Sequence, residues 1–173
     1  MRLLLLGIFM FGFVGLADAD TKPKRKHTKK PPYEIIDGLW QGPRLPHGTY
    51  DWEVIVFGAA EWQPKEKFYP GAKAVYARLS DVPKPAAKTW QEAVDAAYEV
   101  AYALHTGKAV LVTCGQGYNR SGLVSALAMI ILGYDTEEAI TIIRKQRGPS
   151  ALRNKTFLKF IRAFVPEELP DIE

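Results

Sequence analysis

The sequence contains a single cysteine, Cys114, so the chain cannot form an intrachain disulfide. It also lacks any cluster of cysteine and histidine with the spacing of a metal site. His27, His47 and His105 are scattered, and we expect them to be solvated or capping residues rather than ligands. A lone cysteine without a disulfide or metal partner is a candidate nucleophile.

Most of the chain carries little net charge. The formal net charge of +4 comes mainly from residues 22–30, and the remainder is nearly neutral. We therefore infer no nucleic-acid binding by the folded part itself. Hydrophobic residues make up 47% of the sequence and charged residues 24%, which is typical of one globular domain with a sizeable core.

Residues 1–19 form an apolar segment that ends in a small-residue pattern at 17–19. This arrangement is typical of a secretory signal peptide. The basic residues that follow it instead favour a short membrane anchor with the domain in the cytoplasm. An upstream extension that is not normally part of the protein is the third interpretation. A free thiol slightly favours the cytoplasmic side over secretion.

Residues 20–32 form a basic linker that contains prolines. This composition cannot bury a core, so we expect a solvated tether. Contact of the linker with an anionic membrane or with nucleic acid is the alternative. We expect the globular domain over residues 33–166, a C-terminal tail at 167–173, and a monomer.

Hydrophobic patterning predicts strands alternating with helices. Asp37-Gly38 is typical of a tight turn, which would join the first two strands as a hairpin. Residues 61–71 should form a loop or a short irregular helix. The predicted strands are 34–36, 39–41, 54–57, 74–79 and 108–113, and the predicted helices are 86–104, 121–132, 136–146 (capped by Thr136) and 154–164. This order indicates a single α/β domain with a mostly parallel central sheet, a hairpin at one edge and flanking helices.

Residues 110–122 have the pattern of an apolar strand, a glycine-rich turn and the start of a helix. Five residues, two of them glycine, separate Cys114 from Arg120, so the backbone N–H groups of the turn can point inward and form an anion-binding nest. The helix that begins at Ser121 directs its N-terminal partial positive charge at the same place. A phosphate group would fit there.

Cys114 lies at the rim of this nest, where the helix dipole, the N–H donors and a guanidinium all favour thiolate over thiol. A thiolate is a nucleophile at neutral pH. Arg120 has the planar fork of donors that can hold two phosphoryl oxygens at once. The combination indicates attack of sulfur on a bound phosphomonoester. A buried structural cysteine, with Arg120 as a surface charge, would leave the glycines and the strand-to-helix switch unexplained.

The sequence Cys114-Gly115-Gln116-Gly117-Tyr118-Asn119-Arg120-Ser121 resembles the CX5R phosphate-binding loop of the cysteine-dependent protein phosphatases, in particular the small dual-specificity phosphatases. The resemblance extends over about residues 35–164. It implies a two-step reaction through a phosphocysteine, without a metal or cofactor, with residues 115–120 binding the substrate phosphate. The family usually has histidine before the cysteine. Here Thr113 stands there, so we expect a working site with a less well stabilised thiolate, in which the Thr113 hydroxyl can support the loop by bonding to nearby backbone.

The leaving group needs a proton, so we expect a general acid on a loop that faces the nest. Asp81 follows a predicted strand, and Pro83 and Pro85 stiffen its loop. The family's acid also lies one strand and one long helix before the cysteine, so the resemblance favours Asp81 over Asp51 and Glu61. Capping of a turn is the alternative role for Asp81.

Two further residues have supporting roles that the resemblance implies. In the second step an ionised Asp81 would activate water while the Ser121 hydroxyl helps the thiolate to leave. Asn154 resembles the family's asparagine that braces the phosphate loop, although an N-cap of the last helix would have the same sequence pattern.

Residues 115–119 carry no positive charge, which a nest for polyphosphorylated inositol lipids would be expected to add. The loop therefore favours a phosphoprotein substrate with phosphotyrosine or phosphoserine/threonine. A lipid or RNA 5′-phosphatase on the same scaffold, recruited by the basic linker, and a phosphate-binding module without catalysis are the alternatives. A rhodanese-like or arsenate-reducing protein fits less well, because the first prefers another loop length and the second usually needs more cysteines.

Overall fold

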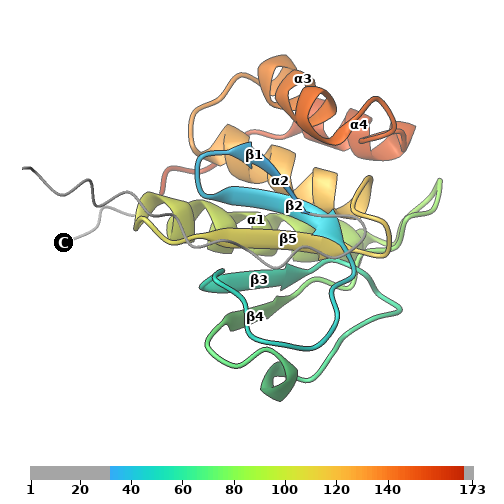
Figure 1. Ribbon diagram of the computed structural model, residues 1–173. Helices are drawn as coiled ribbons and strands as arrows, with labels where there is room; N and C mark the ends of the chain where they lie inside the picture. The colour runs from blue at the N-terminus through green and yellow to red at the C-terminus, as the bar shows by residue number, and fades with distance from the viewer. Residues whose placement is uncertain (1–31, 170–173) are drawn as a thin grey trace, which may run out of the picture.

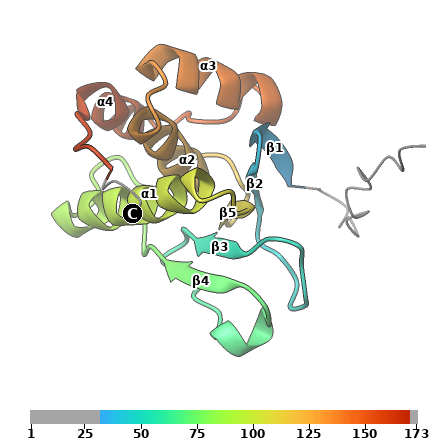
Figure 2. The same cartoon turned by 90° about the vertical axis from the view of Figure 1, so that its left-hand side faces the viewer.

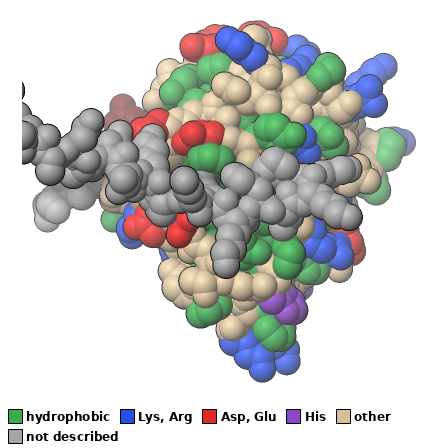
Figure 3. Space-filling view, viewed as in Figure 1, with side chains coloured by type: hydrophobic (Ala, Val, Ile, Leu, Met, Phe, Trp, Pro, Cys, Tyr) green, Lys and Arg blue, Asp and Glu red, His purple; other side chains and the backbone are tan. Residues whose placement is uncertain are grey.

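The computed structural model describes residues 32–169 of the chain (Figure 1). The predicted apolar segment at 1–19 and residues 20–31 of the predicted linker lie outside the described residues, as does the end of the predicted tail. Within residues 32–169, no helix combines the length and apolar character that a membrane crossing would need. Lysine and arginine side chains are scattered over the face shown in Figure 3 rather than gathered in one patch.

The described chain alternates strands and helices much as the hydrophobic pattern predicts. The strands are β1 (Tyr33–Ile36), β2 (Leu39–Pro43), β3 (Val54–Phe57), β4 (Lys73–Tyr76) and β5 (Val110–Cys114). The helices are α1 (Ala87–His105), α2 (Arg120–Ile131), α3 (Thr136–Arg147) and α4 (Lys155–Ala163). A 3₁₀ turn at Glu66–Phe68 lies in the region predicted as a loop or short irregular helix.

The five strands form one sheet in the order β1-β2-β5-β3-β4. The edge strand β1 runs antiparallel to β2, and the remaining neighbours are parallel. The predicted α/β architecture, with a hairpin at one edge of a mostly parallel sheet, is therefore confirmed. Because parallel strands end at the same edge of a sheet, the loops that follow β2, β3, β4 and β5 come together there.

The helices pack on one side of the sheet, with α2 lying between α1 and the pair α3 and α4 (Figure 2). Residues 121–131 of α2 are all buried, as expected for a helix that is apolar on every side. The opposite side of the sheet is covered by a second apolar cluster around Trp52, Phe57 and Tyr69. The N-terminal end of α2 follows the end of the central strand β5 after the short loop 115–119.

Two predicted details of the elements are wrong. Helix α3 is capped by Asp135 rather than Thr136, since the Asp135 carboxylate accepts hydrogen bonds from the backbone N–H groups of Glu137 and Glu138. Both residue types make good caps, and the sequence pattern placed the helix boundary one residue too late. The strand predicted over 74–79 ends at Tyr76. The Ala77 N–H still bonds to the Phe57 carbonyl of β3, but the Arg78 N–H bonds to the Glu92 carboxylate of α1 instead of a strand.

Candidate active site

The loop between β5 and α2 makes a tight turn against the end of β2. Gly117 has a φ of +70°, and a Cβ atom there would lie 2.4 Å from the carbonyl carbon of Gly42. Only glycine meets both conditions, the left-handed conformation and the close approach of two backbones. The loop is thereby pressed against β2, with Cys114 at the end of β5 and Arg120 at the start of α2.

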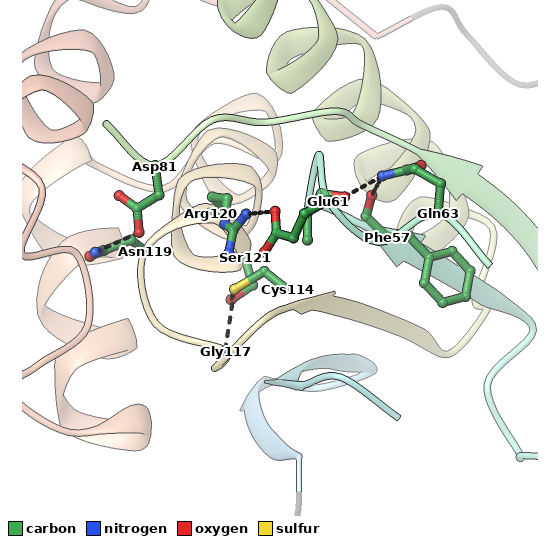
Figure 4. Close-up of polar contacts among 10 residues, drawn as sticks. Phe57, Glu61, Gln63, Asp81, Cys114, Gly117, Asn119, Arg120 and Ser121 are labelled. Carbon is green, nitrogen blue, oxygen red and sulfur yellow. Dashed lines mark hydrogen bonds and ion pairs between the residues drawn. The ribbon is translucent and has the colours of Figure 1, made fainter. Parts of the chain in front are cut away.

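Cys114 is 3% exposed, and its sulfur lies at the base of this turn. Its Sγ accepts a hydrogen bond from the Gly117 backbone N–H at 3.2 Å, and the Ser121 hydroxyl lies 3.5 Å from it (Figure 4). The structure therefore places Ser121 beside the sulfur, where its predicted role requires it.

Arg120 forms an ion pair with Glu61, which comes from the loop after β3 (Figure 4). Burial opposes the charged form of Arg120, but the hydrogen bond to Glu61 and the nearby charges of Cys114 and Asp81 outweigh it, so the pKa of Arg120 lies above its ordinary value. The Nη2 atom of Arg120 faces Gly115 in the loop, while Nη1 contacts Glu61. One side of the guanidinium thus faces the loop while the other is held by a carboxylate.

Glu61 is anchored by the loop that carries it. The Ala60 backbone N–H bonds to the Leu79 carbonyl at 3.2 Å, and the Gln63 amide donates to the Ala59 carbonyl at 2.5 Å. The hydrogen bond from Arg120 is the largest cause that holds the pKa of Glu61 below its ordinary value, although burial works in the other direction. Glu61, which the sequence offered as an alternative acid, is thus paired with Arg120. Asp51, the other alternative, is exposed and does not line the cavity.

Asp81 lies on the opposite side of the site from Glu61 (Figure 4). Its carboxylate accepts hydrogen bonds from the side-chain amides of Asn119 at 3.0 Å and Asn154 at 2.9 Å. The Asn119 side-chain oxygen in turn accepts from the backbone N–H groups of Arg153 and Asn154, at 2.8 and 3.3 Å. Residues 77–86, called the acid loop for the predicted role of Asp81, residues 115–119, called the phosphate loop, and the start of α4 are therefore joined through two asparagines.

Asn154 caps α4, since its side-chain oxygen accepts from the N–H groups of Thr156 and Phe157 at 3.0 and 3.3 Å. The N-cap interpretation is therefore confirmed. The Asn154 side chain donates to Asp81, and the Asn154 backbone N–H donates to the Asn119 side chain. Asn154 therefore contacts the phosphate loop at Asn119 through its backbone. Its bracing of the phosphate loop stays a prediction.

Thr113 is fully buried, and its hydroxyl has no hydrogen-bond partner among the described residues. The expectation that this hydroxyl bonds nearby backbone is therefore wrong. Thr113 lies in the middle of the sheet, paired with Gly42 of β2 and Phe57 of β3, so the backbone groups beside it are already used by the sheet. Its own carbonyl accepts from the Gly58 N–H at 2.7 Å.

Two residues that sequence reasoning missed hold the outer side of the loop. Arg147, at the end of α3, donates from Nε to the Gly117 carbonyl at 2.8 Å and from Nη2 to the Gln116 carbonyl at 2.9 Å. Gln41 of β2 donates to the same Gly117 carbonyl at 3.1 Å. No local signal in the sequence distinguished Arg147 from an ordinary cation in the last turn of a helix.

Arg147 is 7% exposed and forms no ion pair within residues 32–169. Its guanidinium instead lies between the rings of Tyr118 and Tyr33, 4.0 and 4.7 Å from their centres. Aromatic faces attract such a cation. A buried positive charge without a carboxylate partner in the described chain therefore lies beneath the phosphate loop.

These residues line a cavity of about 430 Å³. Its wall contains the predicted Asp81, Cys114, Gln116, Tyr118, Asn119 and Arg120, together with Ser150 and Arg153, which sequence reasoning did not single out. The nucleophile candidate, the guanidinium and the acid candidate therefore share one cavity. Within the described chain, no group of three or more histidine, cysteine, aspartate or glutamate residues could hold a metal ion.

No protein-family model matches the sequence, and no curated protein sequence matches it either. Solved structures do match. Human DUSP28 superposes with a TM-score of 0.65 at 20% identity, covering 75% of this chain and 92% of that one. A mouse protein described as a dual specificity phosphatase, solved with zinc tungstate, gives a TM-score of 0.63 at 16% identity and covers 86% and 90% of the two chains.

A third neighbour, the human tyrosine phosphatase-like serine/threonine/tyrosine-interacting protein, has a TM-score of 0.57 at 18% identity, with 76% of this chain and 93% of that chain covered. The three structures share one arrangement of sheet and helices with this protein over most of their length. The chain therefore has the fold of the dual-specificity phosphatases.

Proposed function

We propose that this protein is a cysteine-dependent protein phosphatase that hydrolyses phosphotyrosine or phosphoserine/threonine through a phosphocysteine on Cys114. The observation that carries the proposal is the shared cavity, which is lined by a sulfur with a backbone N–H donor, a guanidinium and a carboxyl group. The fold of the dual-specificity phosphatases supports it. Catalysis requires these groups to act on one phosphoryl group.

In the first step the Cys114 thiolate attacks phosphorus, so that an S–P bond forms as the bond to the leaving oxygen breaks. The loop N–H groups and Arg120 hold the phosphoryl oxygens while their charge shifts. Asp81 transfers its proton to the leaving oxygen, which departs as an alcohol or phenol. The two asparagines that contact the Asp81 carboxyl group position it at the cavity wall.

In the second step water attacks the phosphocysteine. Asp81, now ionised, takes a proton from the water as the new P–O bond forms and the S–P bond breaks. The Ser121 hydroxyl, 3.5 Å from Sγ, can donate to the sulfur as it leaves as a thiolate. Inorganic phosphate is released and the starting state is restored.

Cys114→Ser should abolish hydrolysis of an aryl phosphate, because a serine hydroxyl in this nest remains protonated and is a poor nucleophile. The native protein should hydrolyse the same compound equally well with and without a chelator. Initial rates on an aryl phosphate, a phosphopeptide, a phosphoinositide and a 5′-triphosphorylated RNA, with both proteins side by side, check this. Full activity of Cys114→Ser would contradict the proposal, and a preference for the lipid or the RNA would assign another substrate class.

Asp81→Asn should slow turnover most for substrates with poor leaving groups, because these depend on the proton that Asp81 supplies. We expect a loss of about 100-fold or more with an alkyl or phenyl phosphate and a much smaller loss with a nitrophenyl phosphate. Values of kcat across a series of leaving groups measure the difference. Asp51→Asn is the matched control and should match the native protein, since Asp51 is exposed and does not line the cavity. A uniform effect of Asp81→Asn would assign the acid elsewhere.

Glu61→Ala should raise KM for an aryl phosphate about three- to tenfold, because Arg120 loses the carboxylate that orients it. Glu61→Gln keeps an acceptor and should show a smaller rise. Since the folded pKa of Glu61 lies below its ordinary 4.5, the ion pair stabilises the fold above about pH 4.5 and is lost as the pH falls through the folded pKa. Melting temperatures from pH 7 to pH 3 should show a smaller acid-side loss for Glu61→Gln. A lower KM in Glu61→Ala would instead identify Glu61 as a competitor of the phosphate.

Arg147→Met should lower the free energy of unfolding by about 1–3 kcal/mol, because the Gln116 carbonyl loses its donor and the Gly117 carbonyl keeps only the one from Gln41. It should also weaken binding of inorganic phosphate, since the loop loses both its support and a nearby positive charge. Urea denaturation and competitive inhibition by phosphate measure the two effects. Arg162→Met is the control: Arg162 is exposed and paired with Glu137, so a much smaller change than for Arg147→Met is expected. Equal effects of the two substitutions would refute this role of Arg147.

A further inference from the structure

A second cavity, of about 390 Å³, adjoins the catalytic one. The two share part of their walls, because Asp81, Asn119 and Arg153 line both. Lys155 and Thr156 at the start of α4 and Val82 of the acid loop also contribute to the second cavity. A molecule that occupies the catalytic cavity can therefore extend into the second one without leaving the surface.

The shape of the second cavity is held by hydrogen bonds between its two sides. The Thr156 hydroxyl donates to the Pro83 carbonyl at 2.7 Å, and the Asn154 amide donates to the Val82 carbonyl at 3.3 Å. The acid loop is thus tied to the first turn of α4. The cavity therefore lies between the acid loop and the start of α4, which these hydrogen bonds hold together, and a ligand within it would contact both segments.

The charges that line this cavity are predominantly positive. Arg153 and Lys155 form no ion pair with any residue of the described range 32–169, whereas Arg162, on the same helix as Lys155, pairs with Glu137 at 2.6 Å. Asp81 is the one carboxylate in the lining, and amide groups of Asn119 and Asn154 already occupy its oxygens. In the proposed first step Asp81 is protonated, which leaves two cations uncompensated.

We propose that this cavity binds a second anionic group of a peptide substrate, an acidic or phosphorylated side chain one or two residues from the phosphorylated residue under attack. The proposal rests on the proposed function, which places the first phosphate at Cys114. An extended peptide advances about 3.3 Å per residue, so one or two residues span cavities that share a wall. The lining contains no aromatic ring on which a nucleobase could stack, which favours a peptide over RNA.

The test compares phosphopeptides that differ only in a flanking residue, which is alanine, glutamate, phosphoserine or lysine. In the native protein kcat/KM should be about three- to tenfold higher with glutamate or phosphoserine than with alanine. Lys155→Ala and Arg153→Ala should each bring this ratio toward one, and Lys155→Glu should favour the lysine peptide. The native preference should also shrink as ionic strength rises.

Lys159→Ala is the matched control, because Lys159 is exposed on the same helix and does not line the cavity. It should keep the native ratio. Native ratios near one, or ratios that Lys155→Ala and Arg153→Ala leave unchanged, would overturn the proposal. Stronger competition by a 5′-phosphorylated RNA than by the acidic peptide would overturn it in favour of a nucleic acid.

Binding of the same peptides to Cys114→Ser, followed by fluorescence anisotropy, separates this proposal from the proposed function. If the native protein hydrolyses no aryl phosphate, the proposed function fails, yet tighter binding of the glutamate peptide, lost in Cys114→Ser/Lys155→Ala, still supports the second site. If hydrolysis is found but the affinities for the glutamate and alanine peptides are equal, the second site fails and the proposed function stands.

Discussion

The conformation of the phosphate loop depends on hydrogen-bond donors for its backbone carbonyl groups. A turn whose N–H groups point inward toward an anion must direct its carbonyls outward into the protein, where each needs a partner. Arg147 and Gln41 supply the donors for Gln116 and Gly117, and the Leu152 N–H bonds to the Tyr118 carbonyl at 3.3 Å. The conformation of the loop is therefore maintained by groups that do not line the cavity.

The same contacts determine the electrostatics of the site. Within the described chain, the buried charge of Arg147 contacts aromatic rings and carbonyl groups rather than a carboxylate. Its positive potential at the loop is therefore not neutralised by a nearby negative charge. The N-terminus of the buried helix α2 adds a partial charge of the same sign. Glu61 balances part of this charge by holding Arg120 from the outside. The nest is thus positive without any lysine or arginine among residues 115–119.

The parallel sheet explains how distant segments meet at one cavity. The chain leaves β3 toward Glu61, leaves β4 toward Asp81, and leaves β5 through Cys114, all at the same edge. Backbone bonds between these exits, such as that from Gly58 to Thr113, fix their relative positions. The start of α4 then closes the remaining side through Asn154.

Local patterns in the sequence were enough to predict the order of strands and helices, the α/β class and the loop from Cys114 to Arg120, because periodicity, glycines and helix starts act over a few residues. Asp81 was singled out by a strand end, by prolines and by family resemblance. The tertiary structure alone decided that Arg147 and Gln41 hold the Gly117 carbonyl, since these contacts join residues 30 and 76 positions apart. It also decided that Glu61 lies on Arg120 and that the Thr113 hydroxyl finds no partner in the described chain, because both depend on which strands are neighbours in the sheet.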